Sequence, residues 1–289
     1  MLRRVILTAT LVVIICPGYF YAPAAGASDI RSVPADLTVP KMTEEEPAAG
    51  RRVQQTLPAY KETDVYHAIY LPTDWKPGGR YPVIVEYAGN GPYQNKLGDR
   101  CTGRVEDCNM GYGISGGCGY IWICMPYISS DGTQNQLKWW GNADRTSQYC
   151  IDAVRMICEK YGGDPDAVIL SGFSRGAIAC NYIGLRDDEI AKLWCGFVCH
   201  SHYDGVRRWG YADDDREAAA RRLKRLGDRP QWISHERSVD HTQKYLEEAC
   251  PGGRFTFQPL PYQNHTDAWT LRDIPLRREV REFCRQACE

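Results

Sequence analysis

The sequence predicts an α/β fold in which helices cover both faces of a mainly parallel sheet. Short and nearly continuous hydrophobic runs, such as residues 83–85 and 168–170, are typical of strands that are buried on both faces. Segments with helical periodicity separate these runs, as the crossovers between parallel strands require. The chain has 289 residues, of which 43% are hydrophobic, and this is enough for a large core.

The elements follow one another in alternating order. Hydrophobic pattern and length predict strands over residues 65–71, 81–87, 120–126, 167–171, 193–200, 230–234 and 255–260. Helices are predicted over residues 144–161, 175–185, 214–226, 238–249 and 276–288. We therefore expect one large domain over residues 60–289. Residues 28–59 are rich in Pro, Ala and Glu without a sustained period, which predicts a flexible leader.

The first 27 residues have the features of a signal peptide. Arg3 and Arg4 precede a twelve-residue apolar run, which is too short to span a bilayer, and small residues lie at 25–27. We expect cleavage near Ala27, a secreted or periplasmic protein, and no stable membrane insertion after cleavage. Lipid attachment at Cys16 is disfavoured because Ile15 is larger than such processing prefers.

The cysteine content and the net charge indicate which cross-links, metal sites and binding partners are compatible with the sequence. Thirteen cysteines are present, and twelve remain after signal cleavage, so export would allow some to pair. Cys101 and Cys108 bracket a polar loop and are plausible partners, whereas Cys180, Cys195 and Cys199 lie in apolar runs as candidate buried thiols. No CxxC pair occurs, which argues against a zinc ribbon. A net charge of −1 argues against nucleic acid as a partner.

A serine between a predicted strand and a predicted helix is the main functional signal. Residues 172–176 are Gly-Phe-Ser-Arg-Gly, so Ser174 lies at the centre of a G-x-S-x-G pattern. Such a turn holds a serine nucleophile in a strained conformation, and the glycines let strand and helix approach closely. The backbone N–H of Arg175, at the helix start, is a candidate donor to an oxyanion. A structural glycine turn is the alternative.

A second oxyanion donor is expected in the loop after the strand over residues 81–87. Gly89, Asn90 and Gly91 lie there, and glycines allow backbone N–H groups to approach a substrate carbonyl. A plain turn is the alternative, because Asn and Gly are common in turns.

The general base is expected to be His265, which follows the last predicted strand by a few residues. The acid that orients it is expected after the strand over residues 230–234. Asp240 is preferred for its spacing from that strand, although it is equally suited to the first turn of the next helix. Glu236 is the second candidate and Asp204 the third.

Residues 200–204 follow another predicted strand and face the expected binding crevice. We expect His202 and Tyr203 to contact substrate there, together with Trp139. Alternation on an extended segment also permits a metal site formed by His200, His202 and Asp204, which is the less favoured reading of this segment.

Taken with these motifs, residues 60–288 resemble the α/β-hydrolase superfamily. Residues 161–165, Tyr-Gly-Gly-Asp-Pro, are similar to the approach to the serine in secreted polyhydroxybutyrate depolymerases and feruloyl esterases, although Arg175 departs from that branch. The resemblance implies an α/β-hydrolase fold and a triad of Ser174, His265 and Asp240. It also implies an acyl-enzyme intermediate, no metal, no cofactor, and a small-molecule or polymeric ester substrate. A peptidase of the same fold and a non-catalytic binding protein are the alternatives.

Overall fold

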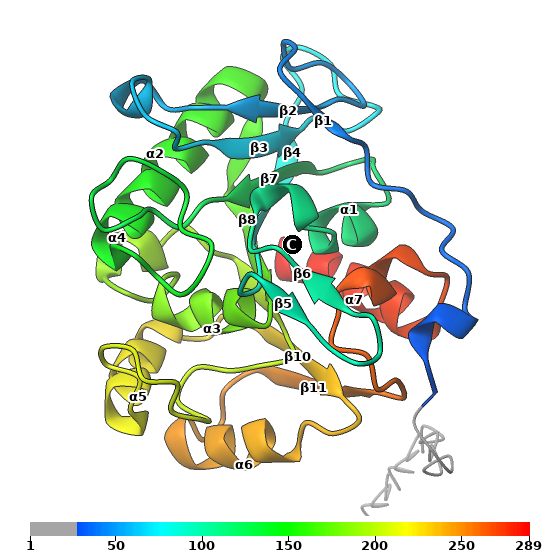
Figure 1. The fold of residues 1–289 in the computed structure, drawn as a ribbon, viewed down its shortest axis with the longest axis vertical. Helices are drawn as coiled ribbons and strands as arrows, with labels where there is room; N and C mark the ends of the chain where they lie inside the picture. Colours follow the sequence, from blue (N-terminus) through cyan, green and yellow to red (C-terminus); the bar gives the residue numbers. More distant parts are fainter. Residues whose placement is uncertain (1–27) are drawn as a thin grey trace, which may run out of the picture.

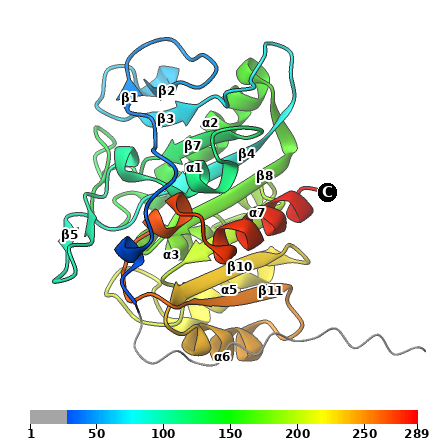
Figure 2. The ribbon, with the colours of Figure 1, turned by 90° about the vertical axis from the view of Figure 1, so that its right-hand side faces the viewer.

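The structure, a computed structural model, describes residues 28–289. A nine-stranded sheet in the order β1-β2-β3-β7-β4-β8-β9-β10-β11 forms the centre of the molecule (Figure 1). Strand β3 pairs antiparallel with β2 and β7, and the other neighbours in this sheet are parallel. The strands are β1 (Met42–Thr43), β2 (Arg52–Gln55), β3 (His67–Tyr70), β4 (Tyr81–Tyr87), β7 (Ile121–Met125), β8 (Gly163–Phe173), β9 (Gly196–His200), β10 (Gln231–Glu236) and β11 (Phe255–Leu260). A separate hairpin of β5 (Tyr93–Gln94) and β6 (Arg100–Cys101) projects from the body of the domain (Figure 2).

Helices cover both faces of the sheet, and each face has its own hydrophobic cluster. One face carries α2 (Ala143–Tyr161), α3 (Arg175–Tyr182), α4 (Asp188–Ala191), α5 (Arg216–Leu223) and α6 (Asp240–Ala249). The other carries α1 (Met110–Ser115) and α7 (Pro275–Ala287) (Figure 2). Short 3₁₀ turns are η1 (Ile30–Ser32), η2 (Pro58–Tyr60), η3 (Val105–Asp107), η4 (Lys224–Leu226) and η5 (Ala268–Leu271). Strands β4, β8 and β9 lie between the two clusters, which explains their nearly continuous hydrophobic sequences.

The predicted fold class is confirmed, and each of the seven predicted strands and five predicted helices has a counterpart. The strands and α-helices that were not predicted are short: β1, β2, β5, β6, α1 and α4. Short elements carry too few residues for a period to be recognised.

Residues 28–59 differ from the expected flexible leader. Ile30 is buried, and its backbone N–H donates to the Asn264 side chain at 2.7 Å. Asp36 forms an ion pair with Arg277 of α7 at 2.6 Å, and the segment (blue) passes beside α1 and α7 (Figure 2). These residues therefore pack on the domain, which extends back to about Ser28. The predicted signal peptide, residues 1–27, lies outside the described residues.

The twelve cysteines among the described residues are all free thiols in the structure. Cys101 and Cys108, the expected partners, are not bonded to each other; both are buried. Cys180 and Cys199 are buried as expected, and Cys195 is half-buried with its sulfur 3.1 Å from that of Cys288. No helix within residues 28–289 has the length and hydrophobicity needed to cross a membrane.

Candidate active site

Ser174 lies directly after β8 and before the first residue of α3. Its backbone has φ 55° and ψ −113°, a strained conformation that is typical of a nucleophile turn. The Ser174 N–H donates to His200 O on the neighbouring strand β9 at 2.9 Å, and this bond helps to hold the strain. A Cβ on Gly176 would lie 1.9 Å from Tyr87 O, so glycine is required where α3 packs on the end of β4.

The loop after β11 brings His265 to this serine. His265 Nε2 lies 3.0 Å from Ser174 Oγ, and the imidazole packs on the ring of Phe173 with 4.7 Å between centroids. The buried carboxylate of Asp99 holds the loop: it accepts the His265 N–H at 2.9 Å and the Asn264 side-chain amide at 2.9 Å. Serine and imidazole therefore meet although 91 positions separate them in the sequence.

Glu236, the last residue of β10, is the acid that the structure places against the imidazole. Its Oε1 accepts from His265 Nδ1 at 2.7 Å. This corrects the preference for Asp240, which is exposed at the start of α6 and whose N–H donates to Ser238 Oγ at 3.1 Å. Asp204, the third candidate, forms a buried ion pair with Arg222 at 2.8 Å. The chain order Ser, acid, His is retained with Glu236.

The surroundings of Glu236 favour its charged form. Burial raises the pKa of this carboxyl, but hydrogen bonds from His235 and His265 outweigh burial and hold the pKa well below its ordinary value. The Ser201 hydroxyl also donates to Glu236 Oε1. An ionised Glu236 fixes the His265 tautomer with the proton on Nδ1, which leaves Nε2 free to accept a proton from Ser174.

Three backbone N–H groups near the serine have no hydrogen-bond acceptor within residues 28–289: those of Gly89, Asn90 and Arg175. The Arg175 group is the first N–H of α3, where the helix dipole favours negative charge. The Gly91 N–H, also expected as a donor, instead donates to Leu137 O at 2.9 Å. Gly91 is therefore excluded as an oxyanion donor, and Gly89, Asn90 and Arg175 remain.

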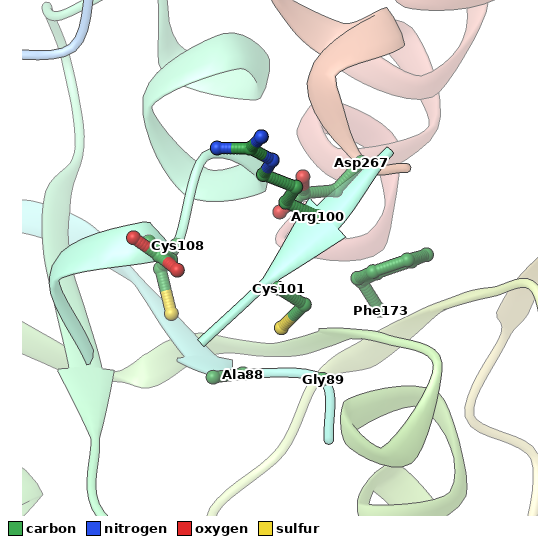
Figure 3. A pocket seen from close by; sticks show the side chains of 8 residues that line it. Ala88, Gly89, Arg100, Cys101, Cys108, Phe173 and Asp267 are labelled. Atoms are coloured by element: carbon green, nitrogen blue, oxygen red, sulfur yellow. The ribbon is translucent and has the colours of Figure 1, made fainter. Parts of the chain in front are cut away.

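Close packing behind the loop after β4 explains why residue 89 is glycine. Figure 3 shows the side chains of Cys101 and Phe173 beside the Ala88–Gly89 backbone, around a very small cavity of about 10 Å³. A Cβ on Gly89 would lie 3.1 Å from both Cys101 Sγ and Phe173 Cδ1. The loop is therefore confined between the β5–β6 hairpin and the residue preceding the nucleophile.

The three residues predicted to contact substrate, His202, Tyr203 and Trp139, all line cavities. The His202 ring is 5.2 Å from the His265 ring, and His202 lines a cavity of about 430 Å³ with His235 and Trp209. Tyr203 also borders this cavity, but its buried hydroxyl donates to Gln231 at 2.6 Å. Trp139 packs on Trp209, with 5.8 Å between centroids, and lines a second cavity of about 450 Å³. His202 therefore lies beside the His265 ring, and Trp139 contacts the loop after β4 through its N–H, which donates to Asn90 Oδ1 at 2.8 Å.

The alternative metal site at residues 200–204 is not formed. Both nitrogens of His200 are engaged, with Ser234 Oγ at 3.0 Å and with Thr266 O at 3.1 Å. Asp204 is paired with Arg222. The three side chains therefore do not converge on one point.

Sequence reasoning missed two residues that build the site, Asp99 and Ser201. Asp99 lies in the long insertion between β4 and β7, where no pattern marks a single acidic residue. Ser201 has φ 83°, and its hydroxyl lies 3.2 Å from His265 Nδ1 in addition to its bond with Glu236. Its position directly after a predicted strand was the only available signal.

No protein-family model matches the chain, and no curated protein matches it. Solved structures do resemble it. A thermostable esterase has a TM-score of 0.51 at 13% identity, over 81% of this chain and 62% of that chain, so this chain spans under two thirds of that protein. A feruloyl esterase module from Clostridium thermocellum, complexed with sinapinate, has a TM-score of 0.50 at 13% identity, over 86% and 93%. A putative dipeptidyl aminopeptidase IV from Bacteroides ovatus has a TM-score of 0.53 at 17% identity, over 82% and 35%. At these identities the likeness shows the fold, which is the α/β-hydrolase fold that the sequence resemblance implied.

Proposed function

We propose that this chain, which has the α/β-hydrolase fold, is an exported serine hydrolase that cleaves carboxylic esters. The observation that carries the proposal is a continuous relay: Ser174 Oγ lies 3.0 Å from His265 Nε2, and His265 Nδ1 lies 2.7 Å from Glu236. The relay is next to backbone N–H groups without acceptors, as acyl transfer through a charged tetrahedral intermediate requires. Ester substrates are favoured because esterases are among the structures that share the fold.

In the proposed reaction, His265 Nε2 takes the proton of Ser174 as Oγ attacks the substrate carbonyl carbon. The oxyanion receives hydrogen bonds from the N–H of Arg175 and from that of Gly89 or Asn90. The alkoxide leaves with the proton from His265, and an acyl group remains on Ser174. Water then attacks the acyl-enzyme with His265 again as base, and the acid is released. Glu236 stabilises the imidazolium at each step.

We further propose that residues 1–27 are removed on export and that some cysteines pair afterwards. After cleavage the new amino group would be that of Ser28, whose nitrogen already donates to Pro261 O at 3.1 Å. N-terminal sequencing of the exported protein is expected to start near Ser28.

Hydrolysis of short-chain and aromatic p-nitrophenyl esters tests the ester proposal. We expect turnover by the wild type, labelling by a fluorophosphonate, and the loss of both in Ser174→Ala and of turnover in His265→Ala. Labelling without ester turnover, but with cleavage of peptide substrates, would replace the esterase by a peptidase. A folded wild type that neither turns over nor becomes labelled would leave a non-catalytic binding protein.

A further inference from the structure

The side chain of Arg175 is buried beneath the active site and has an unusual set of partners. It is 1% exposed, and no carboxylate within residues 28–289 forms an ion pair with it. A buried guanidinium without a carboxylate needs its N–H groups satisfied in another way. The face of Tyr127, 3.8 Å from the guanidinium carbon, supplies part of this compensation.

The guanidinium donates to backbone carbonyls of the segments that surround the nucleophile. The two short bonds go from Nη2 to Gly89 O and from Nη1 to Trp139 O, both at 2.8 Å. Longer bonds of 3.3–3.4 Å reach Gly103 O, Gln136 O and Ala88 O. One side chain therefore ties the loop after β4 to two other loops.

The bond to Gly89 O determines the direction of a candidate oxyanion donor. The Gly89 carbonyl and the Asn90 N–H belong to one planar peptide, in which they point in opposite directions. With the carbonyl held on Arg175, the Asn90 N–H must point away from the guanidinium. Because Gly89 has no Cβ, this peptide would otherwise rotate at little cost, and rotation would exchange the N–H for a carbonyl.

A second contact closes the network on the same loop. The Asn90 side-chain oxygen accepts the Trp139 N–H at 2.8 Å, while the Trp139 carbonyl is held by Arg175. Trp139 has φ 54°, so its backbone is itself strained and needs such anchors. Arg175 therefore holds the peptide that precedes Asn90 directly, and it holds the Asn90 side chain through Trp139.

We infer that the Arg175 side chain is a positioning residue that orients the Gly89–Asn90 peptide, so that its N–H serves as the second oxyanion donor. The inference rests on the proposed hydrolase function and deepens it. Arg175 then has two separate roles: its backbone N–H is one donor, and its side chain sets the direction of the other.

The variant Arg175→Met tests the inference, with Arg52→Met as a matched control. Arg52 is 3% exposed, donates to Val105 O and Glu106 O, and lies 4.5 Å from the Trp122 ring, but it contacts neither Gly89 nor Trp139. Both variants remove a buried guanidinium from backbone carbonyls and an aromatic face. Only Arg175→Met releases the Gly89 carbonyl.

For Arg175→Met we expect kcat per active site to fall roughly 10- to 100-fold, with KM changed less than threefold, because a misdirected donor weakens transition-state binding. Active sites are counted by fluorophosphonate titration, so misfolded material does not enter kcat. The midpoint of the pH–rate profile is expected to stay unchanged, since His265 and Glu236 are untouched. Arg175→Lys keeps the charge with fewer donors, and we expect an intermediate kcat. Arg52→Met is expected to keep the wild-type kcat per site, whatever its melting temperature.

Equal kcat per titrated site in wild type, Arg175→Lys and Arg175→Met would overturn the positioning role while leaving the hydrolase proposal intact. Equal losses in Arg52→Met and Arg175→Met would also overturn it, because the effect would then be one of general packing. A wild type that neither hydrolyses esters nor reacts with fluorophosphonate would refute the proposed function, and the positioning role with it. If Arg175→Met does not fold, Arg175→Lys alone decides by the same kcat per site.

Discussion

At the scale of the residue, the choice of acid shows how one strand end changes a site. The strand that was predicted to end at Ser234 continues in the structure to Glu236, which pairs in register with Leu260 of β11. This extension carries the Glu236 carboxylate to the edge where His265 lies. Asp240, four residues later, begins α6 on the outer surface instead. Spacing along the chain favoured Asp240. Because β10 extends to Glu236, however, it is the Glu236 carboxylate that reaches His265.

We expect Glu236→Gln to lower kcat by about 10²- to 10⁴-fold, because an amide cannot stabilise the His265 imidazolium as a carboxylate does. Asp240→Asn serves as the control and is expected to stay within about twofold of wild type. The measurement is kcat and KM with a short-chain p-nitrophenyl ester. A large loss in Asp240→Asn with an active Glu236→Gln would restore the acid that the spacing favoured.

At the scale of the element, a pair of thiols lies between the last helix and the sheet. The last helix, α7, ends beside the start of β9, and there Cys195 Sγ lies 3.1 Å from Cys288 Sγ. Hydrogen bonding from Cys195 lowers the pKa of Cys288, although burial opposes this, and a thiolate is the species that attacks a disulfide. This pair is therefore the best placed for a cross-link between α7 and the sheet.

Under oxidising conditions we expect a Cys195–Cys288 disulfide. Thiol–disulfide exchange with oxidised glutathione would form it, with the two protein thiols oxidised and one disulfide reduced to two glutathione thiols. Peptide mapping of alkylated, non-reduced protein should recover the linked peptides. Closing a loop of this length is expected to add about 2–4 kcal/mol to the free energy of unfolding, and Cys195→Ser should lose that gain.

The matched control for the cross-link is Cys250→Ser, because Cys250 is half-buried at the C-terminal cap of another helix, α6. Oxidised glutathione should stabilise Cys250→Ser as much as it stabilises the wild type. Recovery of both Cys195 and Cys288 as alkylated free thiols, or of Cys288 linked to Cys284, would contradict the prediction.

At the scale of the whole molecule, buried histidines make stability depend on pH. Burial lowers the pKa of His67 and of His200 to about 4 and that of His202 to about 3. Unfolded histidine titrates near pH 6.5, so below that pH the unfolded chain binds more protons than the folded one. Stability from these groups is therefore complete above pH 6.5 and is lost as the pH falls toward 4. Asp267, whose pKa burial raises to about 8, acts in the opposite direction, as do Glu86 and Asp204, whose pKa burial also raises. His235 acts in that direction too, because burial lowers its pKa but the hydrogen bond with Glu236 outweighs burial and raises it. The contribution of one histidine is therefore measured as a difference between matched variants.

We expect each buried histidine to lower the free energy of unfolding by about 1.4 kcal/mol per pH unit as the pH falls from 6.5 to 4.5. Of the three, His67 lies on β3, away from Ser174, and its Nδ1 contacts the Tyr149 hydroxyl at 2.8 Å. In urea unfolding, the free energy of unfolding of the wild type relative to that of His67→Gln should therefore fall by about 1.4 kcal/mol per pH unit as the pH falls from 6.5 to 4.5. The exposed His241 provides the control: His241→Gln should keep the wild-type slope, and identical slopes for all three proteins would refute the assignment.

The sequence by itself determined the fold class, the order of the long elements, the nucleophile turn at Ser174 and the position of His265 after the last strand. Each of these depends on local patterns, namely hydrophobic period, glycine spacing and chain order. Only the tertiary structure decided that Glu236 contacts the imidazole, that the Gly91 N–H is already bonded, that Asp99 holds the histidine loop and that residues 28–59 belong to the domain. Each of these is a contact between segments far apart in the chain, and such a contact leaves no periodic trace in either segment alone.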